Sequence, residues 1–258
     1  RRPARCPRSP APSRTGPRTA PARARTNRVS SRHDAQARPG PHCPARDVNP
    51  LPVATPGTDG GAATVRGETS SPLFEALAGA LGEVEHVSIL DLGPAIGGNI
   101  EFFGRFPCAL HIADAVEALA GLRPEIDPET GAIRTTPLDA EVRRQLPGAG
   151  NGAFDVILGW DLLNYLDGPV FSAFAAQLHP LLRHGTRLHA FLWSQPRMPV
   201  LPARFRILDA AHMGFEASDR TRECPRYTQR DLERRLPELR VQRSVLLCSG
   251  LQEYVFLA

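Results

Sequence analysis

Four aspartates recur at similar intervals along this chain, and the first of them stands beside a glycine-rich loop. Asp114 follows Asp91 by 23 residues, Asp139 follows Asp114 by 25, and Asp161 follows Asp139 by 22. The loop, residues 93–98, comes directly after the first aspartate. A carboxylate at this point repels a pyrophosphate, because both are anions, and attracts a ligand with an ammonium or sulfonium group. The loop therefore favours a cationic cofactor over a dinucleotide.

The aspartates follow segments whose composition predicts buried strands, and helical segments alternate with these strands. Because parallel strands of a doubly wound sheet end along one edge, the four carboxylates are expected to converge on one crevice. Strands are expected at residues 87–90, 109–113, 132–136, 154–159 and 186–193, and helices at 73–81, 99–106, 116–122 and 170–182.

The C-terminal part of the sequence is expected to add antiparallel strands to the sheet. Strands are expected at 239–247 and 253–257, and the short connection between them allows only an antiparallel pair. Just before them, Thr228 and Asp231 predict a capping box for a short helix.

Residues 71–258 are therefore expected to form one α/β domain. Its core is predicted to be a doubly wound, mostly parallel seven-stranded sheet with an antiparallel last strand. The Arg- and Pro-rich segment 194–227 is expected to be an insertion that covers the substrate side, with a short strand at 205–208.

Residues 1–70 differ in composition from the rest of the chain. They contain 13 arginines, four acidic residues and 12 of the 26 prolines, whereas residues 71–258 contain 18 arginines and 23 acidic residues. The first segment thus has a net charge of +9 and the remainder −5, which sum to +4. Without apolar periodicity, residues 1–70 are predicted to be a disordered tail. A basic arm for RNA or an anionic membrane, a transit peptide, a linker, and translated GC-rich sequence upstream of a start codon are the interpretations left open.

Composition also argues against several classes of protein. The acidic balance of residues 71–258 disfavours nucleic-acid binding by the domain. Charged residues interrupt every apolar stretch, so no membrane-spanning segment is expected. The five cysteines are scattered without CxxC pairs, and the histidines at 179, 184 and 189 are expected on different elements. No metal site is therefore expected, and the cysteine pattern predicts a cytoplasmic protein.

With these elements in place, the domain resembles the class I S-adenosylmethionine-dependent methyltransferases. The resemblance covers nearly all of residues 71–258 and rests on the motif Asp91-x-Gly93-x-x-x-Gly97 and on the strand-end acids. It implies S-adenosylmethionine as the cofactor. It also implies that Asp91 and the loop through Gly93, Gly97 and Asn99 hold the methionyl end of that cofactor.

The same resemblance assigns roles to the later aspartates. Asp114 would accept both ribose hydroxyls, which is a bidentate role suited to a carboxylate. Asp139 would accept the adenine amino group, with the Ala140 backbone beside it. Trp160 and Asp161 would border the sulfonium and its methyl group.

Methyl transfer from a sulfonium requires alignment of the acceptor above all, and a general base only if the acceptor must lose a proton. Asp161 and Tyr165 are the candidate catalytic residues, although Tyr165 could equally be an aromatic side chain packed against the following helix. The acceptor is unidentified, and a small molecule or a protein is favoured over nucleic acid. The oligomeric state is not predicted. A catalytically silent domain that serves as an interaction module is the alternative, and an NAD(P)-binding oxidoreductase is the third hypothesis.

Overall fold

The computed structural model describes residues 64–148 and 153–258, so residues 1–63 of the expected tail lie outside the described residues. Within this part, the main sheet has six strands instead of the expected seven, in the order β10-β11-β5-β4-β2-β3. The strands are β2 (Val87–Asp91), β3 (Cys108–Ile112), β4 (Val156–Trp160), β5 (Arg187–Trp193), β10 (Arg240–Leu246) and β11 (Leu251–Leu257). Strands β3, β2, β4 and β5 are parallel, and β11 is antiparallel to both of its neighbours. The mixed α/β architecture with an antiparallel hairpin at one edge is confirmed.

The strand expected at residues 132–136 was a wrong prediction. Ile133 forms only an isolated bridge with Ile126 and is 42% exposed, and helix α4 (Thr135–Gln145) begins within the segment. Pro137 lies in the first turn of this helix, where its missing N–H leaves no hydrogen bond unmade. Asp139 and Ala140 therefore lie inside α4 and not at a strand end.

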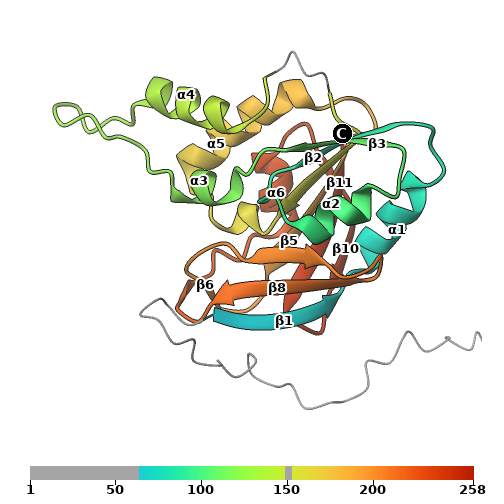
Figure 1. Ribbon diagram of the computed structural model, residues 1–258. Helices are drawn as coiled ribbons and strands as arrows, with labels where there is room; N and C mark the ends of the chain where they lie inside the picture. Colours follow the sequence, from blue (N-terminus) through green and yellow to red (C-terminus); the bar gives the residue numbers. More distant parts are fainter. Residues whose placement is uncertain (1–63, 149–152) are drawn as a thin grey trace, which may run out of the picture. The chain divides into compact units, whose positions relative to one another are not determined.

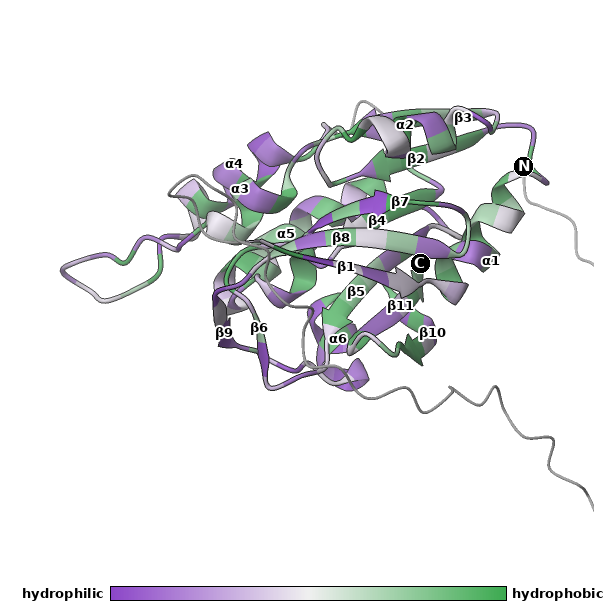
Figure 2. Cartoon of the chain, turned by 60° about the horizontal axis from the view of Figure 1, so that its bottom comes forward, coloured by the Kyte–Doolittle hydropathy of each residue, from purple (hydrophilic) through white to green (hydrophobic). Residues whose placement is uncertain are grey.

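Helices cover the main sheet (Figure 1), and the buried residues of helices Pro72–Leu81 and Gly168–Leu178 are all apolar. The strands β4 and β5 are mostly coloured as hydrophobic in Figure 2, whereas α4 carries long hydrophilic stretches. The expected capping box at Thr228 and Asp231 is confirmed, since each side chain accepts from the backbone N–H of the other residue. The other helices are α1 (Pro72–Leu81), α2 (Gly97–Phe103), α3 (Val116–Gly121), α5 (Gly168–Leu178) and α6 (Gln229–Arg235), with 3₁₀ turns at Leu162–Asn164 and His179–Leu181.

A second, three-stranded sheet joins the start of the described chain to the insertion. Strand β1 (Thr64–Ser70) pairs with β8 (His212–Ser218), which pairs with β7 (Arg204–Ile207), all antiparallel. Figure 1 shows β1 beside β8 although most of the described chain separates them in sequence. Residues 64–70, assigned from composition to the tail, thus belong to the folded domain. The insertion also contains the strand pair β6 (Arg197–Pro199) and β9 (Thr221–Glu223).

A buried carboxylate fixes the start of α1 on the main sheet. Glu253, on β11, is fully buried and accepts hydrogen bonds from the backbone N–H groups of Leu73 and Phe74 at 3.0 and 2.9 Å. It also accepts from the Ser71 hydroxyl at 2.5 Å and contacts His189 Nε2 at 2.8 Å. A carboxylate from a distant strand therefore binds two of the free N–H groups of the first helical turn. Among the described residues, no helix has the length and apolar character needed to cross a membrane.

Candidate functional site

The direction in which the chain crosses the sheet reverses between β2 and β4. From β2 the chain passes to β3 on one side, and it then returns to β4 on the other side of β2. Ligands of open α/β sheets bind at such a switch point, outside the carboxyl ends of the strands. Asp91 ends β2 and Trp160 ends the neighbouring β4. Asp114 follows the end of β3 by two residues.

The buried Asp91 side chain fixes the start of the glycine-rich loop by hydrogen bonds. Its Oδ1 accepts hydrogen bonds from the Gly93 N–H at 2.8 Å and from the Trp160 indole N–H at 2.6 Å. The side chain is buried, and this burial raises its pKa to about 6 although the two hydrogen bonds oppose the shift; the charge of Asp114 raises the pKa further. Asp91 and Asp114 are thus close enough for their charges to interact, as the strand-end spacing predicted.

Gly93 is needed because the Trp160 ring lies against it. A Cβ at this position would be 2.5 Å from Trp160 Nε1 and 2.8 Å from its Cδ1. Trp160 itself has a φ of +47°, which is rare for a bulky residue and shows that tertiary contacts hold it in place.

We expect Gly93→Ala to displace the Trp160 indole from Asp91 and to lower the free energy of unfolding by about 1–3 kcal/mol, the usual cost of overpacking. Urea denaturation, followed by tryptophan fluorescence and by circular dichroism, measures both effects. Gly97→Ala is the matched control, because a Cβ there meets nothing within 4 Å. Equal stability of the two variants would contradict this account of Gly93.

Asp114 faces solvent beside this loop. It has a φ of +49°, a conformation that aspartate and asparagine tolerate better than most residues. The neighbouring Ala113 N–H donates to the Asp91 carbonyl at 2.8 Å, which ties the end of β3 to the end of β2. Gly97, in the same loop, is also exposed. The solvent-facing side of the site therefore consists of Asp114 and the exposed part of the loop.

Asp161 lies on the opposite, buried side of the site. Its Oδ2 accepts from the Trp193 indole N–H at 3.2 Å and from the Ala203 N–H at 3.1 Å. Its Oδ1 is buried and has no hydrogen-bond partner in the described part of the chain. Burial raises the pKa of Asp161 to about 7, against the lowering effect of the Ala203 and Trp193 hydrogen bonds. The carboxyl can therefore take up a proton near neutral pH.

A segment of the insertion, residues 199–207, covers Asp161, and we call it the capping segment. The buried Tyr165 hydroxyl donates to the carbonyls of Pro199 and Leu201, at 3.2 and 2.8 Å. Burial, followed by the charge of Asp161, raises the pKa of Tyr165 well above its ordinary value, although the Arg222 guanidinium 5.0 Å from the ring centre opposes the shift. Tyr165 therefore anchors the capping segment and keeps its proton.

The other end of the capping segment is held by an amide and by aromatic stacking. Asn99 accepts from the Ile207 N–H at 2.8 Å and donates to the Phe205 carbonyl at 3.3 Å. The Phe205 ring stacks on Trp160, with centroids 5.7 Å apart, and on Phe191, at 4.9 Å. Both polar groups of the Asn99 side chain thus bind the insertion, a role that differs from the cofactor contact expected from the loop motif.

The structure brings together most of the residues singled out from the sequence. Asp91, Gly93, Asp114, Trp160 and Asp161 meet at one edge of the sheet, whereas Asp139 and Ala140 lose the strand-end position on which their expected adenine contact was based. Sequence reasoning missed several residues that close the site. Only Trp193 could have been found from the sequence, because it ends β5 as Trp160 ends β4. The missed residues are Trp193, Ala203 and Phe205.

In residues 64–148 and 153–258, no group of three or more His, Cys, Asp or Glu side chains could hold a metal ion.

No protein-family model matches the chain, and no curated protein sequence matches it. Similarity is found only among solved structures.

One such structure is a Burkholderia thailandensis 1,6-didemethyltoxoflavin N1-methyltransferase with bound S-adenosylhomocysteine, at 18% identity and a TM-score of 0.40, covering 71% of this chain and 75% of that chain. A second is a Clostridium acetobutylicum S-adenosylmethionine-dependent methyltransferase, at 14% identity and a TM-score of 0.39, covering 71% and 89%. A third is the glycopeptide N-methyltransferase MtfA with S-adenosylmethionine, at 12% identity and a TM-score of 0.38, covering 72% and 92%.

Proposed function

We propose that this chain binds S-adenosylmethionine across the ends of β2, β3 and β4 and transfers its methyl group to a small-molecule or protein acceptor. The observation that carries the proposal is the position of two carboxylates and a glycine-rich loop at the switch point. Asp91 ends β2, Asp114 follows the neighbouring β3, and the loop that begins after Asp91 is partly exposed. Two carboxylates in one place favour a ligand with a positive charge and with hydroxyl donors.

The residues fit the two halves of this cofactor unequally. The adenosine half has an open place, because Asp114 and Gly97 face solvent. The methionyl half, which the resemblance assigns to Asp91 and Gly93, would need the space that the Trp160 ring fills. We infer that cofactor binding is coupled to movement of Trp160 and of the Phe205 ring stacked on it.

Proton transfer, where the acceptor requires it, is assigned to Asp161 within this proposal. Its Oδ1 is the atom with no hydrogen-bond partner among the described residues, and burial brings the pKa of the carboxyl to about 7. A base whose pKa lies near the working pH is the most effective one. Tyr165 is assigned a positioning role, because its hydroxyl donates to the capping segment.

We expect Asp114→Asn to weaken S-adenosylmethionine binding about ten- to hundredfold, since hydrogen bonds to a charged group contribute about 1.5–3 kcal/mol. Asparagine keeps the positive φ of this position, so the melting temperature is expected to stay unchanged. Titration calorimetry on the full chain measures the affinity. Asp219→Asn, which changes an exposed aspartate away from the switch point, is the control.

The proposal would be contradicted if the unmodified chain bound no S-adenosylmethionine at concentrations up to about 1 mM, since a Kd of that size is a very weak affinity. Equal affinities of the Asp114→Asn variant and the unmodified chain would contradict it as well. Intrinsic fluorescence gives a second readout, because both tryptophans of the chain lie at this site. A change in emission on binding is expected from the inferred movement of Trp160.

A catalytically silent interaction module is the second candidate, and the closure of the site favours it. Asp161 is completely buried, Tyr165 is buried, and the capping segment binds both side chains. Incubation with S-adenosylmethionine and a cell extract distinguishes the two candidates. Release of S-adenosylhomocysteine that is lost in Asp161→Asn supports the methyltransferase, whereas binding without release supports the silent module.

A further inference from the structure

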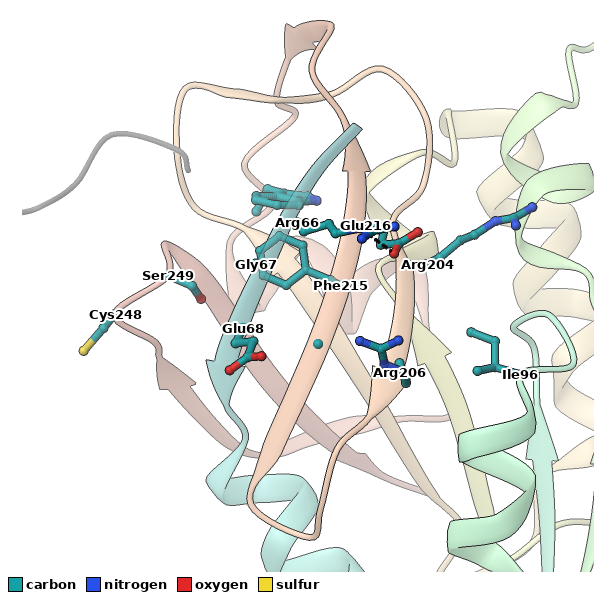
Figure 3. A pocket seen from close by; sticks show the side chains of 12 residues that line it. Arg66, Gly67, Glu68, Ile96, Arg204, Arg206, Phe215, Glu216, Cys248 and Ser249 are labelled. Carbon is teal, nitrogen blue, oxygen red and sulfur yellow. Dashed lines mark ion pairs between the residues drawn. The ribbon is translucent and has the colours of Figure 1, made fainter. Parts of the chain in front are cut away.

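A cavity of about 720 Å³ borders the three-stranded sheet, with Trp193 among its lining residues. Figure 3 shows charged side chains on all three strands around this cavity, together with Ile96 of the glycine-rich loop. Because side chains alternate between the faces of a strand, and directly paired residues share a face, the charged positions form two cross-strand rows on one face of the sheet.

The first row is satisfied within the protein. It runs Arg66, Glu216, Arg204 across β1, β8 and β7. Arg66 Nε lies 2.9 Å from Glu216 Oε1, an ion pair drawn as a dashed line in Figure 3. Arg204 extends away from the row to Glu117, at 3.2 Å. Charges of opposite sign therefore alternate along this row, and each arginine has a partner.

The second row has charges of opposite sign at its two ends and no charged side chain between them. It runs Glu68, Gly214, Arg206. In the described part of the chain neither Glu68 nor Arg206 forms an ion pair, with each other or with another residue. The glycine at the centre contributes no side chain, so the place of the Glu216 carboxylate is vacant in the second row. The apolar Leu208 side chain lies beside this place, with its Cδ2 3.4 Å from a Cβ built on Gly214.

Packing directs the Arg206 guanidinium toward this vacant position. Its Nη2 would be 3.6 Å from a Cβ built on Gly214, and its Cγ would be 3.7 Å from one built on Gly98. The side chain therefore lies over two glycines, which hold its stem without neutralising its charge. Figure 3 shows the Glu68 carboxylate and the Arg206 guanidinium at the same level of the sheet, on its two outer strands.

We propose that the gap between Glu68 and Arg206 binds a zwitterion of the amino-acid type. A guanidinium binds a carboxylate with two parallel hydrogen bonds, and an ammonium group donates to a carboxylate. The two backbones lie about 10 Å apart, twice the strand spacing, and the two side chains reach inward from them. An anion alone would leave Glu68 unpaired, and a cation alone would leave Arg206 unpaired. The cavity also borders the apolar side chain of Ile96, which suits an apolar ligand side chain.

Three probes with a linear aliphatic chain test the requirement for both charges. L-Norleucine carries an ammonium and a carboxylate, hexanoate lacks the ammonium, and pentylamine lacks the carboxylate. Ligand-observed NMR titration of the full chain is expected to show saturable binding of norleucine at least tenfold tighter than that of either control. No saturable norleucine binding, or equal binding of all three probes, would overturn the proposal.

Substitutions then test where norleucine binds. Arg206→Gln and Glu68→Gln are each expected to weaken norleucine binding at least fivefold, whereas Arg220→Gln, an exposed arginine that does not border the cavity, leaves it unchanged. Gly214→Ala is expected to weaken binding without unfolding, because its methyl group would enter the space beside the Arg206 guanidinium while making ordinary contacts, 3.6 Å to Arg206 Nη2 and 3.4 Å to Leu208 Cδ2. Unchanged binding in both charge variants would overturn the assignment.

The proposed site adjoins the glycine-rich loop through Ile96 and Gly98, and a competition experiment tests whether it is separate from the proposed cofactor site. Norleucine binding is expected to persist at saturating S-adenosylmethionine, and Glu68→Gln is expected to leave S-adenosylmethionine affinity unchanged. Displacement of norleucine by S-adenosylmethionine would place the probe at the switch point and overturn the second site. It would leave the proposed methyltransferase function standing.

Discussion

Replacing Glu253 by glutamine is expected to lower the free energy of unfolding by about 3–5 kcal/mol, the cost of breaking a buried charged network. The carboxylate is completely buried and accepts from Ser71, Leu73 and Phe74 while contacting His189. A glutamine of the same shape has one acceptor oxygen fewer and directs an N–H₂ group at other donors. Because domains of this size are stable by about 5–15 kcal/mol, the loss is a large fraction of the total.

Urea denaturation at neutral pH measures this effect. Glu238→Gln is the matched control, since Glu238 is exposed and only approaches His179 at 3.7 Å; a change within about 0.5 kcal/mol is expected there. Burial alone would raise the pKa of Glu253, but the His189 hydrogen bond and charge and the Ser71 and Leu73 hydrogen bonds lower it overall. The stabilisation is therefore present above the ordinary pKa of 4.5 and lost as the pH falls through the folded-state pKa. Equal stability of the two variants would contradict the assigned role.

Asp161→Asn is expected to stabilise the protein at alkaline pH and to have little effect at acid pH. Burial raises the folded-state pKa of Asp161 from 3.8 to about 7. The folded state therefore keeps a proton that the unfolded chain has released, and the associated stability, fully present below pH 3.8, is lost as the pH rises through about 7. At 1.36 kcal/mol for each pKa unit, the asparagine variant gains up to about 4 kcal/mol over the unmodified chain near pH 8.

Denaturation curves at pH 4, 6 and 8 test this sign, with Asp219→Asn as an exposed control. Asp91, whose pKa is raised to about 6 by burial, contributes in the same direction. Subtracting the two curves isolates Asp161, because only that group differs between the proteins. A difference in stability that does not grow with pH would show that Asp161 is charged in the folded protein throughout this range.

Local sequence patterns determined most of the main sheet and its helices. The apolar runs of β2, β4 and β5, the tight β10–β11 connection and the Thr228–Asp231 capping box all depend on residues close together in the chain, and all were predicted correctly. The failure at residues 132–136 has a local reason as well. Ile133 is the only large apolar residue in that segment, and Pro137 follows it as a helix-start residue.

The sequence also determined which acids and glycines would stand at the edge of the sheet, since Asp91, Asp114 and Asp161 follow strands at a spacing set by one strand and one helix. Only the tertiary structure decided what these acids contact. The Trp160–Asp91 and Ala203–Asp161 hydrogen bonds join residues 69 and 42 positions apart, and the pairing of β1 with β8 spans a greater distance still. No local pattern encodes such partners, because they depend on how the insertion packs over the sheet. The same packing made the vacant row between Glu68 and Arg206, whose residues reach one face only through strand register.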